Sequence, residues 1–144
     1  MQPDDTDWKI MEILREGYVP NNTIAGKLHI SEGTVRLRLK KLRDAGIVEI
    51  KALINPDALE KQQLALIAMG VVESRFLEAK AGEVSALENV LSVSIVSGRY
   101  DLIAEVLVDS NKGLVRFLTE QLSTVKGITH SESFIILKSY RKFV

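Results

Sequence analysis

Closely spaced cations between positions 36 and 43 are the residues of this chain best suited to binding chemistry. Lysine and arginine bind phosphate oxygens, and arginine can also pair with guanine through two hydrogen bonds. We expect Thr34 and Arg36 to reach base edges, and Lys40 and Lys41 to bind phosphates. The full set of expected DNA-binding residues is Ser31, Gly33, Thr34, Arg36, Arg38, Lys40 and Lys41. An ordinary solvated charged face is the alternative interpretation of these cations.

A second candidate site is the tetrapeptide Gly98-Arg99-Tyr100-Asp101. A turn at its glycine can expose backbone N–H groups to a carboxylate. Asp101 can accept hydrogen bonds from an ammonium group, and Tyr100 can form an apolar wall. A free amino acid carries this combination of groups, whereas the tetrapeptide by itself favours a plain turn between two strands. The further candidate contacts for such a ligand are Ser131 and Ser133.

A helix-turn-helix over residues 21–48 would position the cations on one exposed helix face. Ser31 can cap its second helix and Gly46 can end it. The apolar stripe that would face inward consists of Val35, Leu39 and Leu42. His29 stands where the turn needs a left-handed conformation, which histidine adopts at a modest cost. A solvated pair of amphipathic helices is the alternative, but the cap, stripe, charged face and glycine agree in register.

The flanking segments complete an expected N-terminal domain at residues 1–55. Residues 5–16 predict a first helix whose apolar side chains, Trp8 and Met11 among them, pack behind the helix-turn-helix. Apolar and polar residues alternate after Gly46 around a possible turn, which predicts a β-hairpin, the wing of a winged helix. Pro56 and its neighbours break regular structure, so we expect a linker at residues 56–63.

Residues 64–144 alternate strand-like and helix-like patterns. The expected strands are 64–72, 90–97, 100–108 and 128–138, and the expected helices are 76–87 and 112–122. This β-α-β-β-α-β order specifies a ferredoxin-like domain with two helices on one face of an antiparallel sheet. The predicted fold class is therefore α+β, with a winged helix-turn-helix domain followed by a ferredoxin-like domain.

Composition narrows the function classes. The 19 Lys and Arg balance the 19 Asp and Glu, but residues 17–55 hold seven cations against three acids, so the positive field is local to the expected helix-turn-helix. The absence of cysteine excludes disulfides and cysteine-based catalysis or metal binding, and we expect neither metal nor cofactor. The longest apolar run is too short to cross a bilayer and no signal-peptide core is present, so a cytoplasmic protein without membrane contact is expected.

Three stretches in order resemble the Lrp/AsnC family of feast/famine transcription regulators. DTDWKIMEIL resembles the family's opening helix, and IAGKLHISEGTVRLRLKKLRDAGIV resembles its helix-turn-helix, with Arg38, Leu42 and Gly46 at matching positions. SGRYDLIAEVLV resembles its G-x-Y-D-L junction. Ser131 and Ser133 echo its final strand, where threonines are more usual. The resemblance covers the chain essentially from end to end.

The resemblance implies a double-stranded DNA-binding domain followed, at residues 64–144, by a RAM-type domain for effector sensing and oligomerisation. It implies dimers that pair through their sheets and assemble further, for example to octamers. Effectors of the family are typically free amino acids, bound between dimers near Gly98–Asp101. Arg38 resembles a position that often supports the fold or a backbone contact. We therefore expect a homo-oligomeric transcription regulator whose assembly and DNA affinity respond to a small effector.

Two other function classes were weighed. No enzyme activity is expected, because His29 and His130 are far apart without neighbouring ligands and no glycine-rich phosphate loop is present. The enzymatic alternative is a tetrapyrrole (sirohaem-type) decarboxylase subunit with the same two-domain plan, which His130 keeps open. The third class is an amino-acid-binding or assembly module that has lost DNA binding. His29 in the turn is its only support, and the cationic helix argues against it.

Overall fold

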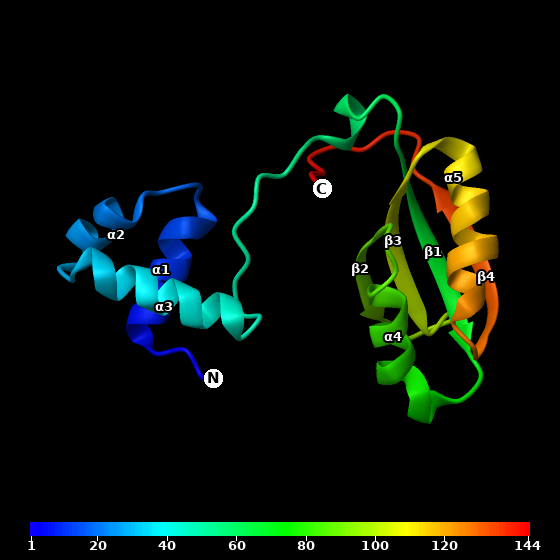
Figure 1. The fold of residues 1–144 in the computed structure, drawn as a ribbon, viewed down its shortest axis with the longest axis horizontal. Coiled ribbons are helices and arrows are strands. Elements are labelled where there is room, and N and C mark those ends of the chain that lie inside the picture. The colour runs from blue at the N-terminus through cyan, green and yellow to red at the C-terminus, as the bar shows by residue number, and fades with distance from the viewer. The chain divides into compact units, whose positions relative to one another are not determined.

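The computed structural model describes residues 1–144, with the exception of the Asn111 side chain. The chain divides into two compact units, residues 1–52 and residues 53–144 (Figure 1). Each unit has its own hydrophobic core. The two cores correspond to the two patterns of the sequence, a helical one in the first unit and an alternating strand–helix one in the second.

The N-terminal unit consists of α1 (Asp5–Arg15), α2 (Asn21–Leu28) and α3 (Glu32–Asp44). Its core contains Ile10, Ile24, Ala25, Val35 and Leu39. The helix-turn-helix is thereby confirmed, with the predicted stripe of α3 facing inward. Trp8 was expected in this core but is 59% exposed. Two residues along a helix are about 200° apart, so the turn that buries Ile10 directs Trp8 outward.

The turn and the helix ends follow the predicted chemistry. His29 follows α2 in the left-handed conformation, with φ 54° and ψ 41°. The N–H of the next residue, Ile30, donates to the Ala25 carbonyl at 3.1 Å and closes the turn. Gly46 follows α3 at φ 67°, again in the left-handed region. The two positive φ angles thus end the two helices of the motif, as such angles commonly do.

The predicted β-hairpin wing is wrong. Residues 47–55 contain no strand in the part of the chain that the structure describes. The N–H groups of Ile47 and Val48 both point back to the Leu42 carbonyl, at 2.9 and 3.4 Å, so they finish α3 instead of starting a ladder. Further along, Ile54 lies in the second unit and exchanges two backbone hydrogen bonds with Val144, at 2.8 and 2.9 Å. The alternating pattern therefore reflects an extended segment without a hairpin partner of its own.

The second unit is the predicted ferredoxin-like domain. Its elements are β1 (Gln63–Val71), α4 (Leu77–Ser85), β2 (Val90–Ile95), β3 (Leu102–Val108), α5 (Ser110–Arg116) and β4 (Ile128–Ile135). The four strands form an antiparallel sheet in the order β2-β3-β1-β4. A π-helical turn at Phe117–Gln121 and a 3₁₀ turn at Leu122–Thr124 extend α5 over the stretch predicted as one helix. The α+β class and the β-α-β-β-α-β order are confirmed.

Both helices of this unit cover the same face of the sheet (Figure 1). Ile67 and Ala104 on the sheet are fully buried in one cluster with Val84 of α4 and with Leu114 and Phe117 around α5. On the opposite face, no helix among the described residues covers the sheet. That face carries the other alternate residues of each strand, because side chains alternate along a strand.

Candidate DNA interface and ligand site

The α3 helix is oriented by its cap and by its buried stripe. The Ser31 hydroxyl accepts a hydrogen bond from the Thr34 N–H at 3.1 Å and lies 2.8 Å from the Thr34 hydroxyl. Val35 and Leu42 are fully buried and Leu39 nearly so. With these three side chains inward, the opposite face of α3 is open to solvent. An exposed helix of this size with cations on its surface fits the DNA major groove.

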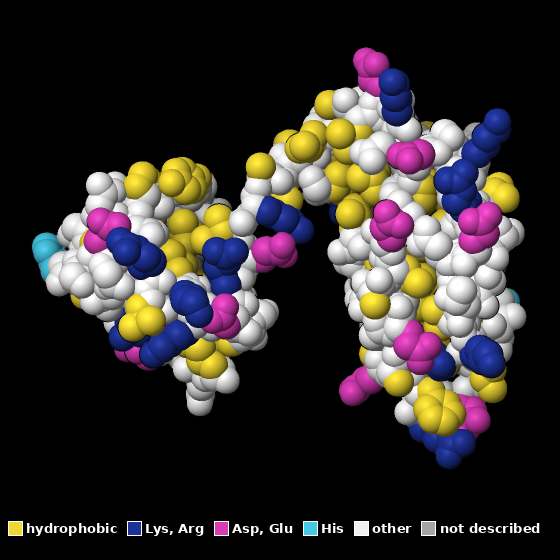
Figure 2. All heavy atoms as spheres, viewed as in Figure 1, with side chains coloured by type: hydrophobic (Ala, Val, Ile, Leu, Met, Phe, Trp, Pro, Cys, Tyr) yellow, Lys and Arg dark blue, Asp and Glu magenta, His cyan; other side chains and the backbone are white. Residues whose placement is uncertain are grey.

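The cations of the exposed face form weak ion pairs, whose acidic partners can be replaced by DNA phosphates. Arg36 pairs with Glu32 at 2.7 Å, and Lys40 pairs with Asp44 at 2.8 Å, each four residues away along the helix. Such exposed pairs contribute little stability. Lys41 makes no ion pair with any described residue. Figure 2 shows dark blue Lys and Arg side chains gathered over α3, interleaved with acidic ones.

Arg38 does not share this face, because its guanidinium turns toward α1. It donates to Asp4 at 2.7 Å and to Asp7 at 2.9 Å. Asp4 and Asp7 also cap α1 reciprocally through each other's backbone N–H groups, at 2.9 and 3.0 Å. The bond from Arg38 lowers the pKa of Asp4, and the two carboxylates raise the pKa of Arg38. Of the seven residues predicted to bind DNA, Arg38 is thus the one that ties α3 to another helix.

One residue of the exposed face was missed by the sequence analysis. Leu37 is 55% exposed, in contrast to the buried Val35, Leu39 and Leu42 of the same helix. On the helix surface it lies beside Lys40 and Lys41, which follow it by three and four residues. The signal was present in the sequence, since Leu37 is the apolar residue of this segment that falls off the inward stripe. Beside this face, a groove of about 970 Å³ is lined by Arg36, Lys40 and Arg43 together with residues 46–50.

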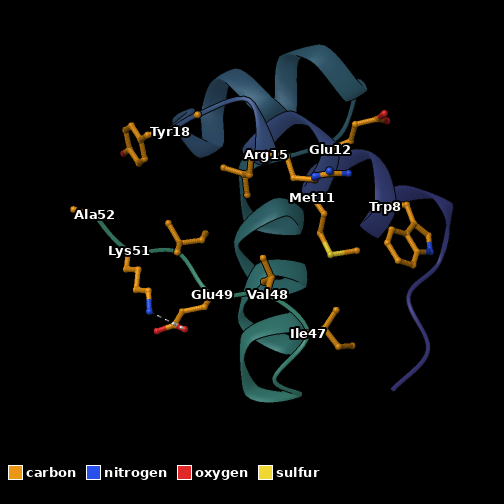
Figure 3. Close-up of a pocket in the computed structure, with 13 residues that line it drawn as sticks. Trp8, Met11, Glu12, Arg15, Tyr18, Ile47, Val48, Glu49, Lys51 and Ala52 are labelled. Carbon is orange, nitrogen blue, oxygen red and sulfur yellow. Dashed lines mark ion pairs between the residues drawn. The ribbon is translucent and has the colours of Figure 1, made fainter. Parts of the chain in front are cut away.

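A second, more apolar hollow of similar volume lies elsewhere on the same unit. It has a volume of about 940 Å³ and lies between α1 and residues 47–52. Figure 3 shows Trp8 and Met11 projecting from α1 and Ile47 and Val48 from the segment after α3. Among the described residues, none of those predicted to bind DNA or a ligand lines this hollow. Its apolar walls suit another protein surface better than a phosphate backbone.

The tetrapeptide of the second candidate site forms a turn before β3. Gly98 has φ 134°, which favours glycine. Asp101 is engaged by the backbone: its carboxylate accepts from the Val71 N–H at 2.8 Å, and its own N–H donates to the Met69 carbonyl at 2.9 Å. These bonds pair two backbone groups of β1, at the place where its pairing with β4 shifts register between Met69 and Val71. The carboxylate predicted to accept a ligand's ammonium group therefore has a structural partner.

Tyr100 contacts a different carboxylate, which the sequence analysis missed. Its hydroxyl donates to Glu132 of β4, and this bond raises the pKa of Tyr100. The Tyr100 ring also lies 5.7 Å from the His130 ring, centroid to centroid. Glu132 makes no ion pair with any described residue. Only strand pairing could have brought residues 100 and 132 together, because nothing local in the sequence relates them.

Ser131 and Ser133 lie on the other face of the same strand. Ser133 pairs with Ile67 and Ser131 with Met69, whose side chains point toward the helices, whereas Glu132 pairs with Ala68 on the helix-free face. Within one chain, the structure therefore does not bring the two serines and Tyr100 to one face. No cluster of His, Asp and Glu suited to a metal ion occurs among the described residues. In those residues no helix has the length and apolar character needed to span a bilayer.

Comparison with known proteins agrees with both units. Residues 65–143 match a family model described as Lrp/AsnC ligand binding domain, and residues 3–49 match one described as winged helix-turn-helix DNA-binding. The HTH-type transcriptional regulator FL11 of Pyrococcus furiosus is 29% identical over 141 residues, covering 96% of this chain and 92% of that protein.

Two solved structures share the fold over nearly the whole chain. The leucine response regulatory protein LrpA of Mycobacterium tuberculosis has 24% identity and a TM-score of 0.78, with 97% of this chain and 96% of that chain covered. A transcriptional regulator of Neisseria meningitidis, solved as a complex with L-Met, has 26% identity and a TM-score of 0.69, with coverage of 99% and 94%.

A helix-turn-helix with an exposed cationic helix, followed by a ferredoxin-like domain, is the architecture of a two-domain DNA-binding regulator. With the two family matches, the chain belongs to the Lrp/AsnC family. It is a transcriptional regulator, not an enzyme, because its named relatives are transcriptional regulators and the two matching family models describe a DNA-binding helix-turn-helix domain and a ligand-binding domain. The tetrapyrrole decarboxylase alternative is not favoured.

Proposed function

We propose that this regulator changes its assembly and its affinity for DNA when a free amino acid binds to its second domain. The observation that carries the proposal is the match of residues 65–143 to a ligand-binding domain, together with a structural neighbour solved with L-Met. The mechanism is linkage. A ligand that favours one arrangement of the copies changes the spacing of their α3 helices and hence the affinity for paired DNA sites.

On DNA, α3 enters the major groove with its N-terminal half against the bases. Thr34 and Arg36 read base edges, whereas Lys40 and Lys41 bind phosphates and fix the register. Ser31 and Gly33 lie at the helix start, where small residues let the backbone approach closely. The exposure of this face and the weak partners of its cations support these roles. Arg38 acts indirectly, by holding α3 against α1.

A second copy of the chain covers the helix-free face of the sheet. Leu66 pairs with Phe134 and Leu64 with Leu107 on that face, so apolar side chains from three strands lie together. Phe134 is 46% exposed within one chain. The apolar hollow of the N-terminal unit offers a further surface for a second copy (Figure 3). Dimers place two recognition helices on neighbouring half-sites, and pairs of dimers assemble further, up to octamers.

The amino acid binds around Gly98–Asp101. Because the Asp101 carboxylate accepts from Val71, we assign the ligand's ammonium group to Glu132, which lies beside Tyr100 and lacks an ion-pair partner among the described residues. Arg99, which precedes Tyr100 in the chain, can bind the ligand's carboxylate. Ser131 and Ser133, on the other face, contribute to a ligand shared with a neighbouring copy.

The function is tested with the full-length protein and the duplex DNA upstream of its own gene. Fluorescence anisotropy across a salt series is combined with sedimentation analysis, with and without each common amino acid. We expect salt-dependent binding that one amino acid shifts, together with a change in assembly. An amino acid that binds without changing either DNA affinity or sedimentation would contradict the linkage. No DNA binding at low salt would contradict the regulator mechanism as a whole.

The assignment of Glu132 is tested by calorimetry with the amino acid identified above. Glu132→Gln should weaken binding at least tenfold, because a charged acceptor for the ammonium group is lost. Glu78→Gln, an exposed carboxylate on α4, is the matched control and should bind normally. In a spectrophotometric titration, Glu132→Gln should also return the raised pKa of Tyr100 toward its ordinary value of 10.0. Unchanged ligand binding in Glu132→Gln would refute this assignment but not the sensing function.

A further inference from the structure

We propose that Leu37 is a specificity-determining residue that contacts the C5-methyl group of thymine in the DNA major groove. This inference rests on the proposed binding of α3 in that groove. The inference adds to that proposed binding an apolar contact and the base that the contact selects. Polar and cationic residues were the expected base readers of this helix, and Leu37 is not one of them.

The exposure of Leu37 is unlike that of the other apolar residues in α3. Val35 and Leu42 are completely buried and Leu39 is nearly so, whereas Leu37 leaves more than half of its surface in water. A single exposed leucine is not unusual on a protein surface. This one lies at the middle of the exposed face of α3, opposite its buried stripe, and yellow side chains are visible among the dark blue ones over α3 in Figure 2.

The neighbours of Leu37 leave room for a base on one side and supply charge on the other. Gly33 lies one turn earlier on the same face, and a Cβ added there would come within 4 Å only of the Ser31 hydroxyl, at 3.8 Å. Lys41 lies one turn later, where it can bind a phosphate. Thr34 and Lys40, three residues earlier and later, lie on the two sides of the leucine. The apolar side chain is thus framed by cations that hold the helix on DNA, with open space toward the helix start.

The chemistry of the major groove determines what Leu37 can contact. Most groups on the base edges there are hydrogen-bond donors or acceptors, and the thymine methyl is the apolar one. A leucine placed against a donor or acceptor would desolvate it without replacing its hydrogen bond. Against a methyl group, the same side chain buries apolar surface from both partners. The helix therefore favours thymine at the position that Leu37 faces.

The test uses duplexes enriched by the full-length protein from a randomised pool. Each enriched duplex is remade with deoxyuridine in place of thymidine, position by position, which removes the methyl group and keeps every hydrogen-bonding atom. For the wild type we expect a loss of about fourfold in affinity at one position in each half-site, the effect of burying one methyl group. Leu37→Ala should bind the thymine duplex more weakly and show no further loss with deoxyuridine.

Two controls separate this contact from other effects. Leu137→Ala changes another exposed leucine, in the second unit, and should keep the wild-type response to deoxyuridine. Leu37→Ala should keep the wild-type salt dependence and sedimentation, because no phosphate contact or protein interface is altered. Equal affinity of the wild type for thymine and deoxyuridine duplexes would overturn this inference alone, as would altered sedimentation of Leu37→Ala. A pool without enrichment would overturn the proposed function and the inference together.

Discussion

At the scale of single residues, Arg38 shows how one cation differs in role from its neighbours. Arg36 and Lys40 make exposed pairs within their own helix, whereas Arg38 reaches two carboxylates of another helix. Its partner Asp7 is almost fully buried. A buried carboxylate that loses its cation retains the full cost of desolvation. The cation therefore supports the domain that presents the DNA-binding face.

Replacing Arg38 by methionine should destabilise the N-terminal unit by about 2 kcal/mol, because Asp7 loses its cation. The change is measured as a shift of the unfolding transition of the N-terminal unit in thermal denaturation of the full chain. Arg36→Met is the matched control and should stay within about 0.5 kcal/mol of the wild type. For DNA binding we expect the larger effect from the other variant. Arg36→Met should reduce the salt dependence of the affinity for DNA, and Arg38→Met should leave it unchanged.

The Asp4 carboxylate gives the N-terminal unit an acid-sensitive bond. The hydrogen bond from Arg38 holds the pKa of Asp4 below its ordinary value of 3.8. A carboxyl whose pKa is lower in the folded state stabilises the fold above its unfolded pKa, and this contribution is lost as pH falls through the folded pKa. We therefore expect the free energy of unfolding of the N-terminal unit to decrease as the pH falls below 3.8. Asp4→Asn should flatten that dependence, and an unchanged pH profile in this variant would contradict the assignment.

At the scale of elements, the helix-turn-helix depends on a left-handed residue that is not glycine. His29 adopts φ 54° and ψ 41° between α2 and α3, a conformation that crowds any Cβ. Its side chain is exposed, so the strain is not offset by burial. The N-terminal unit is therefore less stable with histidine at this position than it would be with a residue that adopts the left-handed conformation without strain.

His29→Gly should stabilise the N-terminal unit by about 0.5–1 kcal/mol, since the relief of left-handed strain exceeds the entropic cost of glycine. His29→Ala is the control: it also removes the imidazole but keeps the Cβ, and should give no stabilisation. Chemical denaturation of the full chain measures both. If alanine stabilised the unit as much as glycine, the imidazole and not the backbone would be the source of the strain.

At the scale of the whole molecule, the helix-free face of the sheet is a surface that no helix covers among the described residues. Phe134→Asp places a charge among Leu66 and its neighbours on that face. We expect this variant to sediment as a smaller species than the wild type and to bind DNA more weakly, because paired half-sites need paired helices. Glu78→Asp on α4 should do neither. A variant that kept the wild-type sedimentation would contradict sheet-to-sheet pairing.

Both domain folds and the exposed face of α3 could be predicted from the sequence. Local signals were sufficient: a cap at Ser31, a stripe at helical spacing and a β-α-β-β-α-β alternation each depend on neighbouring residues. The wing was wrong, because alternation over residues 47–55 indicates an extended segment but not a partner strand. Trp8 was misplaced in the core, because helical spacing alone left open which side of α1 faces inward.

Contacts between charged and polar groups far apart in the chain could not be predicted in this way, because they depend on the folded arrangement. Arg38 and Asp4 are 34 residues apart, and Tyr100 and Glu132 are 32 apart, so no local pattern relates them. The pairing of β1 with β4 puts Glu132, and neither Ser131 nor Ser133, on the helix-free face, and the bond from Val71 engages the Asp101 carboxylate. These relations depend on packing between distant segments, which a sequence specifies only through the complete fold.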